Sequence, residues 1–266
     1  MDRGKKESNL IFNRGKKAVV IAFVLMELLI YIAFMYLDIS VKDSYTISAG
    51  MKFAGILLCF LLTLLLYSRR QAGTDIFLLR GALLFTVVSD LFLLILDYYF
   101  YGMVFFCVVQ LLYMLRLNRW RKEQGRGIRI WILLVRNLLP ALLIIGIFAR
   151  LNSRPDGLLC VSAIYFTGIV LNTADAVLIQ RRSRIKRQRL YAVGMVLFLL
   201  CDINVGLFNM GDFTVIRGSW FGRLYEFAAI AMWMFYLPAQ VGISLSGIEI
   251  KIDNHKKEKK MRFWNF

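Results

Sequence analysis

The fold of this chain is decided by the run of residues 77–97, which reads FLLRGALLFTVVSDLFLLILD. The run is long enough to cross a membrane, because a helix needs roughly 20 mostly apolar residues to span about 30 Å of hydrocarbon. One carboxylate, Asp90, interrupts it deep inside. A charged side chain at the centre of a bilayer costs about 2.5–3.5 kcal/mol on insertion scales, so Asp90 indicates a functional position.

A second stretch of the chain repeats this pattern. Gly194-Met-Val-Leu-Phe198 is followed by Asp202, just as Gly81-Ala-Leu-Leu-Phe85 is followed by Asp90. The similarity predicts a 4+4 arrangement of parallel repeats, related by an axis along the membrane normal. The alternative is that Gly, Leu, Phe and Asp recur by chance in apolar sequence.

The composition excludes a soluble domain, because 59% of the 266 residues are hydrophobic and only 3 are proline. The sequence predicts an all-α, polytopic membrane protein of eight transmembrane helices. These are expected at approximately 18–37, 47–67, 77–97, 98–115, 129–149, 157–180, 190–210 and 226–246. The chain is thus divided into a basic N-terminus (1–17), a membrane domain (18–246) and a basic tail (247–266).

The basic residues alternate between the two sides of this predicted topology. The termini and the loops on their side hold 26 Lys and Arg, and the opposite loops hold 5. By the positive-inside rule both termini are expected in the cytoplasm, with the chain in a bacterial inner membrane, a plasma membrane or an equivalent one. The net charge of +17 is then explained by topology, and no nucleic-acid partner is expected.

Motifs for nucleotide binding, zinc proteolysis and serine hydrolysis are missing from the sequence, and the four cysteines lack metal-ligand spacing. No metal and no cofactor is therefore expected. Function has to be sought among the polar residues embedded in the spans.

Three embedded charges fall at one predicted depth. At about 1.5 Å per residue, Asp90, Asp202 and Lys52 lie roughly 18–22 Å from the cytoplasmic ends of their helices. They are expected to face a common cavity, where each offsets part of the burial cost of the others. Glu27, closer to the cytoplasm, is a further candidate for this site. Two carboxylates in a poorly solvated site do not both ionise readily, so the pair is expected to supply an acid and a base together.

A second polar layer is predicted nearer the cytoplasm, where Arg136 and Asp175 are expected to pair as a packing contact. Its members are Gln110, Arg136, Asn137, Asn172, Asp175 and Gln240.

These residues carry a family resemblance. The run Arg80–Leu94, followed by Tyr101-Gly102, Gln110 and Tyr113, resembles the YhhN membrane proteins, the lysoplasmalogenase family. Further motifs resemble the family in the same order, and they comprise Lys52, Gly194 to Asp202, and Tyr236-Leu-Pro-Ala-Gln240.

The resemblance implies an ether hydrolase of the membrane. Its substrate would be a lysoplasmalogen, a lysophospholipid with one alkenyl chain, whose vinyl ether bond is cleaved to a fatty aldehyde and a glycerophospho-headgroup. Asp90 and Asp202 would be the catalytic aspartates. The residues expected to bind substrate or support them are Lys52, Glu27, Gln110, Tyr113, Tyr236 and Gln240.

Two positions depart from the family pattern. Ser89 stands where the family usually has Gly, and Gln110 stands where it commonly has His. A glutamine does not titrate, so a proton relay through that position would be lost. If that His is essential, the chain is inactive or acts on another substrate.

Two other functions are open to the same residues. A proton-coupled transporter of a small molecule or lipid would use the embedded carboxylates for coupling. A non-catalytic lipid-binding membrane protein would retain its ligand without turnover. The sequence leaves open the headgroup preference, the oligomeric state and the choice of the acid.

Overall fold

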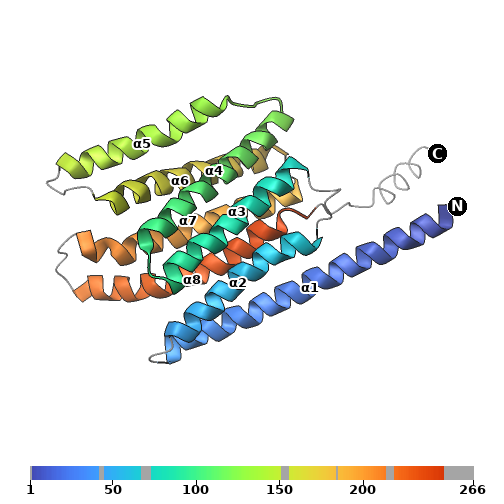
Figure 1. The fold of residues 1–266 in the computed structure, drawn as a ribbon, viewed down its shortest axis with the longest axis horizontal. Helices are drawn as coiled ribbons and strands as arrows, with labels where there is room; N and C mark the ends of the chain where they lie inside the picture. Colours follow the sequence, from blue (N-terminus) through green and yellow to red (C-terminus); the bar gives the residue numbers. More distant parts are fainter. Residues whose placement is uncertain are drawn as a thin grey trace, which may run out of the picture.

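The chain folds into a bundle of long helices that lie side by side (Figure 1). The computed structural model describes residues 2–41, 45–66, 73–150, 156–183, 185–213 and 219–248, and the side chains of 2–14 and 210–221 lie outside this description. The elements are α1 (Asp2–Ser40), α2 (Tyr45–Leu66), α3 (Thr74–Asp90), the π-helical turn η1 (Leu91–Ile95), α4 (Tyr99–Glu123), α5 (Ile130–Arg150), α6 (Gly157–Ser183), α7 (Lys186–Phe213) and α8 (Ser219–Leu245).

The prediction of eight spans is confirmed, because eight helices of the described residues are long and apolar enough to cross a membrane. Helix α1 begins at Asp2 and so runs through the predicted N-terminal segment 1–17. The predicted tail 247–266 lies outside the described residues from position 249 onward.

Six of the helices form a closed ring. In the order α2, α3, α4, α6, α7 and α8 each packs against the next, and α8 packs against α2. Helix α1 lies outside the ring against α2 and α8, and α5 lies outside against α6 (Figure 1). These two are the least buried spans, with 17% and 11% of their apolar windows buried against 39–44% in the ring helices. The interior of the ring is filled by the main hydrophobic core.

The order of contacts in the first four helices recurs in the second four. The α2–α3 contact corresponds to α6–α7, α3–α4 to α7–α8, and α4–α6 to α8–α2. Helices α3 and α7 also run in the same direction (Figure 1). This correspondence supports the predicted 4+4 arrangement.

The glycine of each repeated motif faces the helix that follows it. A Cβ atom on Gly194 would lie 2.8 Å from Ile243 Cγ1 and 3.0 Å from the Ala239 carbonyl oxygen of α8. A Cβ atom on Gly81 would lie 3.3 Å from Leu112 Cδ1 of α4. Small residues at these points let the helix backbones approach closely, as in other membrane bundles.

One end of the bundle, where α2, α4, α6 and α8 finish and α3 and α7 begin, is called the basic end below (right in Figure 1). It is held by Arg116, a fully buried side chain of α4. Its Nε lies 3.1 Å from Asp75 Oδ1 and its Nη1 donates to Ser246 Oγ at 2.9 Å. The guanidinium also packs on the rings of Trp120 and Tyr191, at 4.6 and 4.8 Å. One cation thus connects α3, α4, α7 and the end of α8.

Candidate active site

Asp90 lies where α3 changes from α-helical to π-helical geometry. It is the last residue of α3, and η1 follows it directly. The Asp90 side chain is buried, and its Oδ2 accepts a hydrogen bond of 2.6 Å from the Tyr236 hydroxyl of α8. The neighbouring Ser89 hydroxyl donates to the Gly102 carbonyl of α4 at 2.5 Å. Single π turns inside helices often occur at functional sites. No residue pattern in the sequence predicted this turn.

Asp202 lies on α7 and is partly buried. Its Oδ2 accepts a hydrogen bond of 2.7 Å from the Tyr165 hydroxyl of α6. Tyr165 was not among the candidates, because a tyrosine in an apolar helix has no spacing that distinguishes it from a packing residue. Among the described residues, Oδ1 of each aspartate accepts no hydrogen bond.

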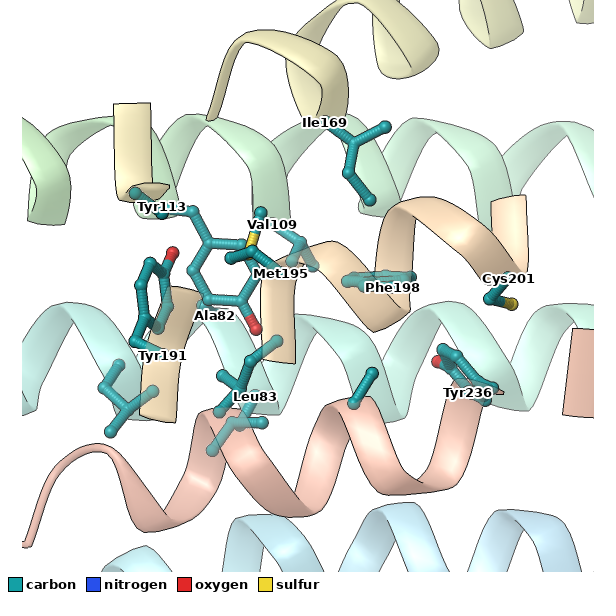
Figure 2. Packing of buried hydrophobic residues seen from close by; sticks show 14 of the residues in the cluster. Ala82, Leu83, Val109, Tyr113, Ile169, Tyr191, Met195, Phe198, Cys201 and Tyr236 are labelled. Atoms are coloured by element: carbon teal, nitrogen blue, oxygen red, sulfur yellow. The ribbon is translucent and has the colours of Figure 1, made fainter. Parts of the chain in front are cut away.

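The two aspartate–tyrosine pairs belong to one aromatic cluster. Ring centroids lie 5.6 Å apart between Tyr236 and Phe198, 6.0 Å between Phe198 and Phe106, and 5.4 Å between Phe106 and Tyr165. Figure 2 shows Phe198 and Cys201 of α7 close to Tyr236. Cys201, which directly precedes Asp202 in the sequence, is buried in the same core. The two acids are therefore connected through one aromatic cluster, each with its own tyrosine.

Two hollows of the described residues are lined by neither Asp90 nor Asp202. One hollow of about 400 Å³ lies over α5 beside Leu142 and Arg150. The other, of about 360 Å³, lies at the basic end between Gln124 and Arg182. The shared cavity stays a prediction.

Lys52 forms a salt bridge with Asp38, which lies one residue beyond the predicted end of the first span. Its Nζ lies 2.8 Å from Asp38 Oδ2 and 4.1 Å from the centroid of the Trp233 ring. Asp38 also accepts a hydrogen bond of 2.5 Å from Ser48. The ring of Trp233 lies 5.8 Å from that of Tyr236, which binds Asp90. Lys52 is therefore joined to the Asp90 site through two aromatic rings, and its salt bridge is with Asp38 instead of either candidate aspartate.

The other candidates lie at three separate places in the bundle. Glu27 is buried among α1, α2 and α8, where Cys59 Sγ lies 3.7 Å from its Oε1. Gln110 accepts a hydrogen bond of 2.9 Å from Asn172 at the contact of α4 with α6. Tyr113 of α4 and Gln240 of α8 are fully buried inside the ring of helices, between the Asp90 site and the basic end. Of the supporting candidates, the structure brings only Tyr236 into contact with a candidate aspartate.

The predicted pair of the second polar layer is confirmed. Arg136 Nη2 of α5 lies 2.7 Å from Asp175 Oδ2 of α6. Arg121 of α4 binds the same carboxylate. This pair joins the peripheral helix α5 to the ring and lies apart from the aspartate–tyrosine cluster.

The comparison with known proteins yields one match. No curated protein and no solved structure matches the chain. The sequence model of the YhhN family matches residues 47–247, a range that holds nearly all of α2–α8 and both aspartates, and the chain therefore belongs to the YhhN family.

Proposed function

We propose that this YhhN-family protein is an integral-membrane hydrolase that cleaves the vinyl ether bond of lysoplasmalogens. The observation that carries the proposal is the pair of embedded carboxyl groups. Each is bound by one tyrosine, and each has a second oxygen that accepts no hydrogen bond from the residues that the structure describes. Burying carboxyl groups in a membrane costs free energy, so their presence indicates a function. Membership of the YhhN family favours a lipid substrate.

The proposed reaction consumes one water molecule. One carboxyl group donates a proton to the alkenyl carbon that does not carry the ether oxygen, which leaves an oxocarbenium cation. Water adds to the carbon that carries the oxygen, and the second carboxylate takes the proton that the water loses. The resulting hemiacetal breaks into a fatty aldehyde and the free hydroxyl of the glycerophospho-headgroup. This is the acid–base logic of paired carboxylates in glycoside hydrolysis, applied to another C–O bond.

The surroundings of the aspartates suit that reaction. The rings of Phe198 and Phe106 connect the two aspartate–tyrosine pairs. Aromatic rings near a developing cation stabilise it when the cation lies over a ring face. The hydroxyls of Tyr236 and Tyr165 hold one oxygen of each carboxyl group in place. The apolar helices around them provide the environment that a single alkenyl chain prefers.

The experiment uses the purified full chain with choline and ethanolamine lysoplasmalogens and measures aldehyde by mass spectrometry. Asp90→Asn and Asp202→Asn each keep an acceptor for their tyrosine but lose the acid or base, so turnover should fall about 100-fold or more. Asp156→Asn is the matched control, because Asp156 is exposed and caps α6 through the Leu159 amide, a role that Asn fills equally well. Normal aldehyde release by both active-site variants would remove the mechanism.

The same preparation tests the other functions. Uptake of lipid into proteoliposomes that stops when the proton gradient is dissipated, with no aldehyde formed, would indicate a transporter. Lipid that copurifies but is never cleaved would indicate a binding protein.

A further inference from the structure

Polar side chains continue from the Asp90 site along the inside of the ring. Thr86 lies four residues before Asp90 on α3, and Gln240 lies four residues after Tyr236 on α8, so each faces the same way as the site residue one turn away. Thr86 and Gln240 are both fully buried. The next layer is Tyr113 of α4, whose side chain is also fully buried.

The same line of residues continues to the surface at the basic end. The ring of Tyr113 packs edge-on against Tyr191 at 5.7 Å, and Tyr191 packs against the buried Arg116. Arg116 binds Asp75, and the same carboxylate lies 3.7 Å from Arg187, whose side chain is 23% exposed. Figure 2 shows Tyr191, Tyr113 and Tyr236 following one another along the bundle, with Met195 and Phe198 beside them. We call this line the polar column, and its members are Thr86, Gln240, Tyr113, Tyr191 and Arg116.

Four atoms of the polar column have no hydrogen-bond partner among the described residues. They are Nε2 and Oε1 of Gln240 and the hydroxyl oxygens of Tyr113 and Tyr191, all buried. The Thr86 hydroxyl donates a hydrogen bond of 2.9 Å to the Ala82 carbonyl. Native proteins pair nearly all buried polar groups, and they use ordered water where no protein group is in reach.

We propose that a chain of water molecules occupies the polar column and delivers the hydrolytic water from the basic end to Asp90. Hydration of the column follows from the four unpartnered atoms, whereas its use rests on the proposed function. A hydrolase closed in by apolar helices needs such a supply, because each turnover consumes one water. The Gln240 amide is suited to bind the water molecule next to Asp90, since it offers both a hydrogen-bond donor and an acceptor.

Radiolytic footprinting tests hydration independently of activity. Short X-ray pulses generate hydroxyl radicals from bound water, and these oxidise neighbouring side chains in the purified, lipid-embedded protein. We expect Tyr113 and Tyr191, which have 0% exposure, to be oxidised faster than Phe23, which is 8% exposed but lies in a separate apolar cluster. Oxidation of both tyrosines no faster than that of Phe23 would overturn the proposal.

Two variants then test delivery. Gln240→Leu and Thr86→Val should lower both the oxidation of Tyr113 and the rate of aldehyde release several-fold. Thr63→Val is the matched control for Thr86→Val, because Thr63 is equally buried and bonds the Phe60 carbonyl at 2.7 Å on α2, outside the polar column. An unchanged rate in both polar-column variants would refute delivery. If either variant fails to fold, the footprint of the unsubstituted protein still decides whether the polar column is hydrated.

The two readouts separate this inference from the proposed function. Oxidised tyrosines without aldehyde release would support the hydrated polar column and refute the hydrolase. Aldehyde release with unoxidised tyrosines would overturn the polar column and leave the hydrolase standing.

Discussion

Each candidate aspartate depends on one tyrosine hydroxyl, from α8 for Asp90 and from α6 for Asp202. The spacing within the repeated motif explains why the partners differ. Asp90 follows Gly81 by nine residues and Asp202 follows Gly194 by eight, so the two carboxylates differ by about 100° of helix rotation. Relative to their glycines they point in different directions, and each meets a different neighbouring helix.

Removing one of these hydroxyls should slow the reaction without abolishing it. A hydrogen bond to a charged group contributes about 1.5–3 kcal/mol, so Tyr236→Phe is expected to lower kcat about 10- to 100-fold. Tyr31→Phe is the control, because the Tyr31 hydroxyl makes only a long bond of 3.3 Å to the Met234 carbonyl. An unchanged kcat for Tyr236→Phe would show that the Asp90 contact is irrelevant to turnover.

Charged residues within apolar spans could be predicted as site residues from the sequence, whereas residues that are common in such spans could not. Asp90 and Asp202 could be predicted, because carboxylates are rare in apolar spans. Asp38 was assigned to a loop, although it lies inside α1, because span ends are uncertain by about 2–4 residues. An aspartate in the last turn of one span and a lysine in the third turn of the next was the available signal. Tyr165 gave none.

At the scale of elements, close helix contacts at glycines position the aspartates. Gly194 lies two turns before Asp202 and lets α7 approach α8, while Gly102 lets α4 approach η1, where a Cβ atom would lie 2.6 Å from Leu93 Cγ. The eight helices followed from hydropathy, but η1 did not. Its amide–carbonyl bond from Leu96 to Leu91 spans five residues, and no residue type in that stretch requires this pattern.

The contact at Gly194 can be tested by adding one methyl group. Gly194→Ala should destabilise the protein by about 1–3 kcal/mol, because the new Cβ would meet the α8 backbone at 3.0 Å. Gly206→Ala on the same helix meets nothing within 4 Å and should be neutral or favourable by up to about 1 kcal/mol. Thermal unfolding of the two variants gives the comparison. Equal melting temperatures would contradict the close packing of α7 on α8.

For the whole molecule, the order of helices around the ring could not be predicted. Lipid-facing and protein-facing residues of a span are similarly apolar, so hydropathy does not show which faces pack together. The pairing of Arg136 with Asp175 was predictable, because two opposite charges in apolar surroundings have few other partners. The side of the membrane that the basic end faces stays a prediction of the charge pattern.

That orientation can be measured with single cysteines in a background where Cys59, Cys107, Cys160 and Cys201 are replaced. Lys122→Cys at the basic end and Tyr99→Cys at the opposite end are both at exposed positions. In intact cells an impermeant thiol reagent should label only Tyr99→Cys, and disruption of the membrane should permit labelling of both. The reverse pattern would place the basic end outside and contradict the positive-inside assignment.

The buried cation at the basic end should matter to the stability of the whole bundle. Asp75→Asn leaves the Arg116 guanidinium buried without its carboxylate, a loss of about 3–5 kcal/mol. Glu123→Gln removes exposed pairs with Arg119 and Arg187 and should cost no more than about 1 kcal/mol. Denaturant unfolding compares them, and similar stabilities would show that Arg116 does not hold the helices together.

The most direct test of the proposed hydrolysis is the reaction of a lysoplasmalogen in D₂O. Protonation of the vinyl ether carbon by an aspartate should leave one deuterium on the carbon next to the aldehyde carbonyl, detected by mass spectrometry at early times. The product should be deuterated with the unsubstituted protein and formed far more slowly with Asp90→Asn or Asp202→Asn. Release of an aldehyde without deuterium, or equal rates in all three proteins, would contradict carboxylate-catalysed cleavage of the vinyl ether.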